Sequence, residues 1–304
     1  MKKIIAAAVA TAFVAPAMAA DVSVTGNVNN YLVNDEVVGS SSDALKTESD
    51  MKITATSEGN NGLSFKAVFN LDQEGTADGG EGVTVSSAAF GSVTIGNPSS
   101  AIDAVDDKTE ILELMDPTSG NADSTVLWKL PTLVDGLSVN VSYAPTDGDN
   151  SGSNETNSLL AIDGNESDGD TANDESGVSF AYQMGPVRLA YGQNDEALEE
   201  NTFVGLQYKA NGIMVAYETN ENKVTSTSVT TDHTSVAAMY TMGDASFRYL
   251  ATGSKVAGAD TVDRSAYGIH YNLGGGATLV VETGSEDAAS SLGEFTGVGI
   301  KYSF

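Results

Sequence analysis

Apolar and polar side chains alternate along most of this chain, in short segments that turn signals separate. The last segment shows the pattern clearly, because every second residue from Val298 to Phe304 is apolar, whereas the residues between them are glycine, lysine and serine. Side chains of a strand point alternately to its two faces, so this segment is predicted to be a strand with one apolar face. It ends the chain on an aromatic residue, which would be an aggregation hazard on the open edge of a soluble sheet.

Sixteen such segments follow one another between residues 20 and 304, and the connections between them alternate in length. Short turns fall near residues 58–62, 90–91, 131–135, 185, 211, 243 and 275. Long loops are expected near residues 33–47, 73–81, 98–123, 145–176, 194–200, 220–232, 253–263 and 285–294. Membrane barrels have short turns on one side and longer loops on the other, whereas a β-sandwich has no reason to alternate so regularly. The pattern predicts an all-β fold, a 16-stranded antiparallel up-and-down transmembrane β-barrel, as a single domain over residues 20–304.

Aromatic residues support this prediction by their place in the segments. Most tyrosines and the single tryptophan lie at apolar-face positions towards segment ends, among them Trp128, Tyr143, Tyr182 and Tyr191. Amphipathic rings prefer the interface between membrane and water, where they form girdles around barrels. An ordinary β-core enriched in aromatic residues is the alternative interpretation.

The first nineteen residues have the features of a secretory signal peptide. Lys2 and Lys3 precede a short apolar run, and Ala17-Met18-Ala19 is a small-x-small cleavage site. Residues 1–19 are therefore predicted to be removed, with an uncleaved anchor as the alternative. The remaining chain contains no apolar run long enough for a membrane-spanning helix and no cysteine, so it is predicted to be secreted, periplasmic or a membrane barrel.

The charge is strongly negative, at −28 with 42 acidic and 14 basic residues. Nucleic-acid binding is disfavoured, because phosphate contacts need a basic face. Such an excess of acids favours attraction of small or divalent cations. A highly solvated surface suited to a saline medium explains it equally well.

Several local sequences resemble those of Gram-negative general diffusion porins. They are the Ala-Met-Ala signal end, the first strand from Asp21 to Gly26, the hairpin from Phe90 to Gly96 before a long third loop, and the terminal Lys301-Tyr-Ser-Phe304. The resemblance covers the mature chain in strand order. It implies a homotrimer in the outer membrane with one pore per subunit, a third loop folded into the lumen, and contact with outer-membrane lipid and lipopolysaccharide. It also implies that the terminal strand, with Tyr302 and Phe304, is recognised by the outer-membrane assembly machinery.

The third long loop, from Pro98 to Asp123, is the main candidate for a pore constriction. The loop is rich in acidic residues and contains a single basic residue, Lys108. The candidate residues are Asp103, Asp106, Asp107, Glu110, Glu113 and Asp116. Residues 107–115 are predicted to form a short helix. At helical spacing Asp106, Glu110 and Glu113 share one face, while Ile111, Leu114 and Met115 share another. We expect the apolar face to pack on the inner barrel wall, with packing against a neighbouring subunit as the alternative.

Basic residues alternate with outward apolar neighbours in the predicted strands, so they are expected to face the lumen. The candidates are Lys52, Lys66, Arg188, Arg248 and Arg264. On the lipid face a charge at the membrane midplane would cost roughly 2–4 kcal/mol. By resemblance, Lys52 and Lys66 form a basic wall opposite the acidic loop, and the two signs would produce a transverse field.

No catalytic constellation stands out in the sequence. The two histidines, His233 and His270, lack a recognisable serine partner and are expected to be solvated. No cofactor or firm metal site is expected. The acidic fourth loop begins at Asp147 like an EF-hand but has Ser158 in place of glutamate at the twelfth position. Loose calcium or magnesium binding is one interpretation of this loop, and a disordered, solvated loop is the other. The predicted function is a cation-preferring channel for passive diffusion of ions and small hydrophilic solutes. The alternative is a secreted or surface acidic β-protein that binds calcium or a partner through its loops.

Overall fold

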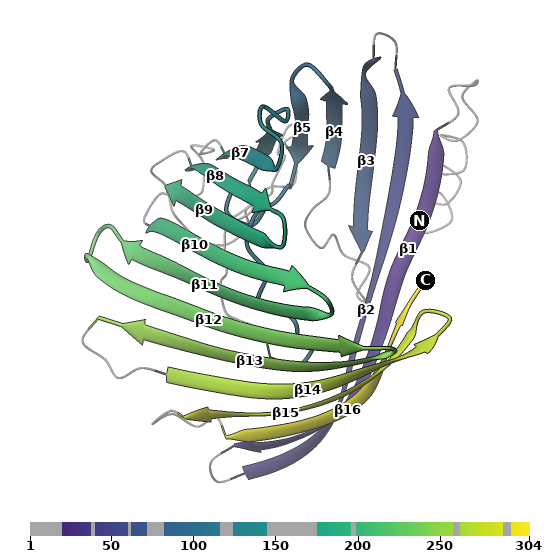
Figure 1. The fold of residues 1–304 in the computed structure, drawn as a ribbon, viewed down its shortest axis with the longest axis vertical. Helices are drawn as coiled ribbons and strands as arrows, with labels where there is room; N and C mark the ends of the chain where they lie inside the picture. The colour runs from purple at the N-terminus through teal and green to yellow at the C-terminus, as the bar shows by residue number, and fades with distance from the viewer. Residues whose placement is uncertain are drawn as a thin grey trace, which may run out of the picture.

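Sixteen strands form a closed antiparallel barrel in the described part of the chain (Figure 1). The computed structural model describes residues 20–37, 40–59, 62–71, 82–115, 124–144, 175–195, 199–257, 262–287 and 293–304. The predicted signal peptide, Asp116 and most of the fourth loop lie outside these residues. The strands are β1 (Asp21–Val37), β2 (Ser40–Glu58), β3 (Ser64–Leu71), β4 (Gly82–Ser87), β5 (Gly91–Gly96), β6 (Val126–Lys129), β7 (Leu137–Ala144), β8 (Glu175–Met184), β9 (Val187–Asp195), β10 (Glu199–Ala210), β11 (Ile213–Val224), β12 (Val229–Met242), β13 (Ala245–Val256), β14 (Val262–Gly274), β15 (Ala277–Asp287) and β16 (Glu294–Ser303).

The barrel closes by pairing of its first and last strands. Asn27 of β1 lies opposite Ser303 of β16, and the pairing continues to Glu36 and Glu294. Gly26 and Phe304 exchange two backbone hydrogen bonds of 3.0 Å each. The predicted sixteen-strand barrel, with the terminal strand beside the first, is thereby confirmed.

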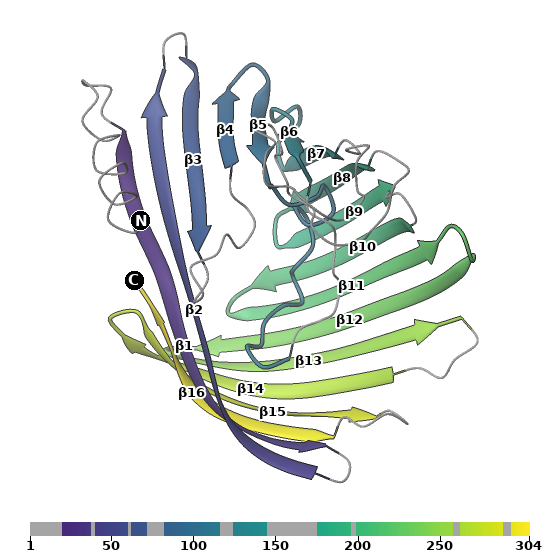
Figure 2. The same ribbon diagram turned by 180° about the vertical axis from the view of Figure 1, so that it is seen from behind.

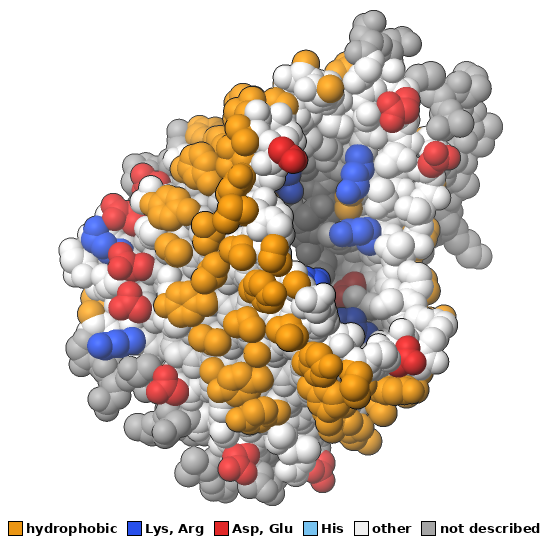
Figure 3. All heavy atoms as spheres, viewed as in Figure 1, with side chains coloured by type: hydrophobic (Ala, Val, Ile, Leu, Met, Phe, Trp, Pro, Cys, Tyr) orange, Lys and Arg blue, Asp and Glu red, His pale blue; other side chains and the backbone are white. Residues whose placement is uncertain are grey.

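The outer face of the barrel is apolar and the inner face is not. On β9, Leu189 and Tyr191 are exposed on the outside, whereas Ala190 between them is buried on the inside. Figure 3 shows the outward hydrophobic side chains as a continuous band across the barrel. A band of this kind matches the hydrocarbon layer of a bilayer.

The tight turns are confirmed, but several loops are shorter than the pattern predicts. Asn211 and Gly212 both adopt positive φ, 52° and 77°, as the turn of a two-residue hairpin requires. The expected loop at residues 33–47 is instead mostly strand, because β1 continues to Val37 and β2 begins at Ser40. The expected loops near residues 194–200, 220–232, 253–263 and 285–294 are likewise partly strand. Most residues of these extensions are polar, so the alternation disappears in the sequence while the backbone pairing persists.

The wall is uneven in height. Strands β3 to β7 have four to eight residues, whereas β10 to β14 have twelve to fourteen. Within the described residues no helix has the length and hydropathy needed to cross a membrane.

Candidate functional site

After β5 the described part of the third loop crosses the barrel interior (Figure 2). Its described part, residues 98–115, contacts inward-facing side chains of β9, β11, β13, β15, β16 and β1. The prediction of a helix over residues 107–115 is wrong, because these residues form bends and irregular backbone. The physical reason is that side chains of the wall, instead of helical hydrogen bonds, satisfy the backbone of the loop.

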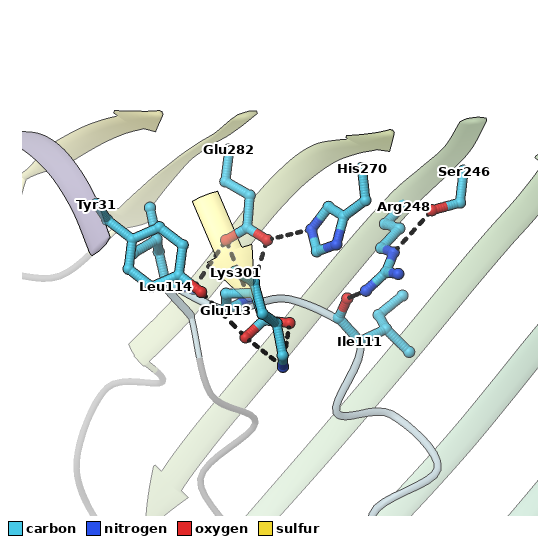
Figure 4. Close-up of polar contacts among 9 residues, drawn as sticks. All are labelled: Tyr31, Ile111, Glu113, Leu114, Ser246, Arg248, His270, Glu282 and Lys301. Atoms are coloured by element: carbon cyan, nitrogen blue, oxygen red, sulfur yellow. Dashed lines mark hydrogen bonds and ion pairs between the residues drawn. The ribbon is translucent and has the colours of Figure 1, made fainter. Parts of the chain in front are cut away.

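Glu282 on β15 is the centre of the first attachment point (Figure 4). Its carboxylate accepts hydrogen bonds from the backbone N–H groups of Glu113, at 2.9 Å and 3.1 Å, and of Leu114, at 2.8 Å. The Nε2 atom of His270 on β14 lies 2.7 Å from the same carboxylate. Both side chains are fully buried, so the expectation of a solvated His270 is wrong. Hydrogen bonds to a buried carboxylate are the stronger kind, and here they hold two consecutive loop residues.

Glu218 on β11 forms a second attachment point of the same design. Its carboxylate accepts hydrogen bonds from the N–H groups of Lys108 at 2.9 Å and Thr109 at 3.0 Å, and from the Thr109 hydroxyl at 2.6 Å. Both Glu218 and Thr109 are buried. Two acidic side chains of the wall therefore bind loop donors at points four to six residues apart.

Two arginines bind the loop through its carbonyl groups. Arg188 on β9 donates from Nη2 to the Val105 oxygen at 2.6 Å, and Arg248 on β13 donates from Nη1 to the Ile111 oxygen at 2.5 Å. Arg248 also donates from Nε to the Ser246 hydroxyl at 3.1 Å. Both arginines thus lie on the wall that carries the loop, where they attach it.

Glycines on the inner wall make room for the apolar side chains of the loop. A Cβ atom at Gly297 would lie 2.2 Å from Leu114, and one at Gly268 would lie 2.7 Å from Leu112. A third, at Gly192, would lie 2.8 Å from Ile102. All of these separations are shorter than side chains tolerate, so the loop sits in hollows that only glycine leaves open.

The apolar loop residues that pack against the wall are only partly the ones that the sequence predicted. Ile111 and Met115 are buried as expected, but Leu112 takes the buried place predicted for Leu114. They pack with Met214, Ala216, Ala237, Leu250 and Ala266 of the wall. Leu114 is half-buried and rests over Gly297. A helical spacing cannot locate contacts in a segment that is not helical.

The acidic candidates of the loop occupy different surroundings. Glu113 accepts hydrogen bonds from the Lys301 ammonium at 2.9 Å and from the Tyr31 hydroxyl at 3.3 Å. Asp106 is buried, Asp103 is half-buried, and Asp107 and Glu110 are exposed. Asp106, Glu110 and Glu113 therefore do not share one exposed face.

Burial raises the pKa of Asp106 to about 9, and the neighbouring carboxylates of Asp107 and Asp103 act in the same direction. Asp106 is therefore protonated at neutral pH. Because the folded state binds this proton more tightly than the unfolded state does, the contribution of Asp106 to stability falls as pH rises from about 4 through about 9.

Asp106→Asn is expected to remove this pH dependence, since the amide cannot ionise. The midpoint of heat unfolding of the variant, relative to that of the wild type, should rise between pH 6 and pH 9. Midpoints can be followed by the mobility of the folded band on gels. If the unfolding midpoints of the variant and the wild type changed with pH in the same way, Asp106 would ionise normally in the folded barrel.

The remaining bases belong to another part of the wall. Lys52 on β2 and Lys66 on β3 are exposed, and Lys129 on β6 is close enough to Lys66 to interact electrostatically with it. Among the described residues, these three lysines form no ion pair within 4.0 Å. Arg264 on β14 differs, because it binds Glu286 at 2.8 Å.

Five residues of the site escaped the sequence prediction: Tyr31, Lys129, Glu218, His270 as a buried group, and Glu282. The alternation did contain part of the signal. Glu218 and Glu282 stand at inward positions between outward neighbours, so they could have been assigned to the inner wall. Their loop partners lie more than 100 residues away in the chain, and strand periodicity says nothing about such contacts.

Metal binding finds no geometric support in the described part of the chain, where no group of three or more His, Cys, Asp or Glu residues could hold an ion. The EF-hand-like start at Asp147 lies outside the described residues.

The closed barrel, its apolar outer band and its wall-bound inner loop define a transmembrane β-barrel of the porin type. A family model for Gram-negative porins matches residues 6–290, and the chain belongs to this family of outer-membrane channels. No curated protein matches the chain.

Solved structures of porins are similar in fold. Salmonella typhi OmpF in complex with daunomycin has a TM-score of 0.73 at 16% identity, over 93% of this chain and 97% of that one. An anion-selective porin from Comamonas acidovorans has a TM-score of 0.71 at 15% identity, over 94% and 100%. A triple mutant of the Rh. blastica porin has a TM-score of 0.69 at 18% identity, over 93% and 100%. At these identities the similarity shows the fold alone.

Proposed function

We propose that this outer-membrane channel is a water-filled pore for passive diffusion of ions and small hydrophilic solutes, with a preference for cations. The observation that carries the proposal is the third loop, which is bound to the inner wall and leaves the carboxylates of Asp107 and Glu110 exposed. Acidic side chains that line a pore favour cations.

The charges of the site support a transverse field across the narrowest zone. Exposed loop acids lie on the wall formed by β9 to β1, whereas Lys52, Lys66 and Lys129 come from β2, β3 and β6. Arg188 and Arg248 belong with the loop instead, because they bind its carbonyl groups. The field we propose therefore runs from the three lysines towards the loop, with Arg264 outside it and neutralised by Glu286.

The reversal potential in a potassium chloride gradient across a planar bilayer tests this function. The wild type should conduct and prefer potassium, and Glu110→Gln with Asp107→Asn should weaken that preference at pH 7. Asp106→Asn is a matched control that should leave it unchanged at pH 7, because Asp106 is already protonated. Lys66→Gln should strengthen it.

The outcomes separate the parts of the proposal. Absence of conductance would contradict a channel, whereas a preference for chloride would contradict only the proposed selectivity. An Asp106→Asn effect as large as that of the double variant Glu110→Gln with Asp107→Asn would contradict the assigned charge states.

Three further expectations stay proposals of the same kind. They are export by a signal peptide in residues 1–19, assembly as a homotrimer, and recognition of the terminal strand through Tyr302 and Phe304. In support of the last, both rings are exposed on the outer face at the end of the chain, with centroids 6.3 Å apart.

A further inference from the structure

The closing seam of the barrel, where residues 27–36 of β1 pair with residues 294–303 of β16, differs from its other strand contacts. Among the sixteen described strands, every other neighbouring pair is consecutive in the chain, whereas β1 and β16 are the first strand and the last. A direct connection keeps consecutive strands close together, but no such connection holds β1 against β16. Separation of this pair therefore frees the most chain entropy, and it exposes two unpaired strand edges.

One carboxylate of the third loop bridges the closing seam on the inside of the barrel (Figure 4). The Oε2 atom of Glu113 accepts hydrogen bonds from the Tyr31 hydroxyl of β1 at 3.3 Å and from the Lys301 ammonium of β16 at 2.9 Å. Its Oε1 atom also accepts from Lys301, at 2.9 Å. Because the backbone N–H of Glu113 binds Glu282 of β15, this loop residue is attached to three strands, of which two form the seam.

Tyr31 carries the contact from the first strand to the loop. Its ring lies across the seam over Gly299 of β16, where a Cβ atom would lie 2.3 Å from the ring. The side chain is fully buried, although it points into the barrel and reaches the loop with its hydroxyl. Burial of an aromatic side chain removes roughly 150–250 Å² of surface from water. The position of this ring thus depends on the paired seam, and its hydrogen bond depends on the docked loop.

The next loop residue adds an apolar contact on the same face of the seam. Gly297 of β16 lies opposite Val33 of β1 in the strand register. A Cβ atom at Gly297 would lie 2.2 Å from Leu114 and 3.5 Å from Val33. Leu114 therefore fills the hollow at Gly297 on the side where Val33 of the first strand borders it. Two consecutive loop residues thus rest on the inner face of the closing seam.

We propose that the third loop has a second role, which is to hold the closing seam of the barrel together. The same loop residue binds the first strand and the last, so its release removes contacts from both sides of the seam at once. The barrel of a variant with a released loop stays closed at rest, but its seam opens more often. This role rests on the closed barrel and not on the ion selectivity of the channel, so a bilayer recording does not decide it.

Hydrogen exchange of the full-length protein in detergent micelles measures how often the seam opens. Glu113→Ala removes the bridge between the two strands, and Tyr31→Phe removes only the hydrogen bond to β1 and keeps the ring. Thr109→Val is the matched control, because it removes a loop hydrogen bond to Glu218 on β11, at the other attachment point. A folded band on unheated gels shows for each variant that the barrel has formed.

Glu113→Ala should speed the exchange of the backbone amides of residues 29–33 and 297–301 about tenfold, because hydrogen bonds to a charged group are lost on both sides of the seam. Tyr31→Phe should have a smaller effect in the same direction. Thr109→Val should leave these amides as protected as in the wild type. The amides paired between β11 and β12 should exchange at the wild-type rate in the two seam variants.

A disulfide across the seam separates this role from other effects of Glu113→Ala. The chain contains no cysteine, so Leu32→Cys with Val298→Cys places one pair on the outer face, at positions that lie opposite each other in the register. In the oxidised protein this pair should return the seam amides of Glu113→Ala to the wild-type exchange rate. The matched pair Tyr217→Cys with Val236→Cys joins β11 to β12 and should leave the fast exchange unchanged.

Three results would overturn the proposal. Wild-type exchange at the seam in both Glu113→Ala and Tyr31→Phe would show that the loop does not hold the two strands together. An effect of Thr109→Val as large as that of Glu113→Ala would show that the loop stabilises the whole barrel and not the seam. Equal rescue of Glu113→Ala by the two disulfides would show the same. Tyr31→Phe keeps the proposal testable if Glu113→Ala fails to assemble.

Discussion

Glu282→Ala is expected to release the third loop from the barrel wall while the barrel stays closed. The carboxylate holds the N–H groups of Glu113 and Leu114 and contacts His270, and all three lose this partner together. Breaking a buried charged interaction costs about 3–5 kcal/mol. The strand pairing of β15 does not depend on this side chain, since it uses backbone groups. The loss therefore falls on the attachment of the loop.

Single-channel recording and hydrogen exchange measure this release. The open-channel current of Glu282→Ala should fluctuate more than that of the wild type, because a loosened loop moves within the pore. The amide protons of Glu113 and Leu114 should exchange faster. Glu286→Ala is the matched control, since Glu286 is also an inward acid of β15 but binds Arg264 instead of the loop. A quiet channel with protected amides would show that Glu218 and the arginines suffice to hold the loop.

Gly297→Val is expected to push the same loop into the pore and lower the conductance. The new Cβ atom would lie 2.2 Å from Leu114 Cδ1, and the wall behind Gly297 cannot retreat because it is paired on both sides. Overpacking of this kind typically costs about 1–3 kcal/mol. The loop is the softer partner, so it moves towards the lumen.

Leu114→Ala tests whether the clash with Leu114 causes the loss of conductance in Gly297→Val. Added to Gly297→Val, it removes the atom that clashes, and the double variant should recover conductance towards that of Leu114→Ala alone. If the conductance losses of the two substitutions simply add, then Gly297→Val acts through the strand and not through the loop.

Much of the fold was predictable from the alternation of side chains. It predicted sixteen strands, the short turns and the pairing of the terminal strand with the first. It also placed Lys52, Lys66, Arg188, Arg248 and Arg264 opposite the apolar face. This succeeds because a membrane barrel repeats one physical rule along every strand: each second side chain contacts lipid.

The failures arose where that rule does not act. Beyond the membrane both faces of a strand are wetted, so the extension of β1 and β2 through residues expected to form a loop left no pattern. The predicted helix assumed that the backbone N–H and C=O groups of the third loop form hydrogen bonds with one another. These groups instead form hydrogen bonds with side chains of the wall, namely Glu218, Glu282, Arg188 and Arg248.

The sequence by itself determined which residues face lipid, because that choice is local and repeats every two residues. Only the tertiary structure decided which acids of the third loop are exposed. Asp106 and Glu113 are buried or paired by groups from distant strands, whereas Asp107 and Glu110 are exposed. Barrel closure brings those strands together, and the charge of the pore depends on contacts that exist only after closure.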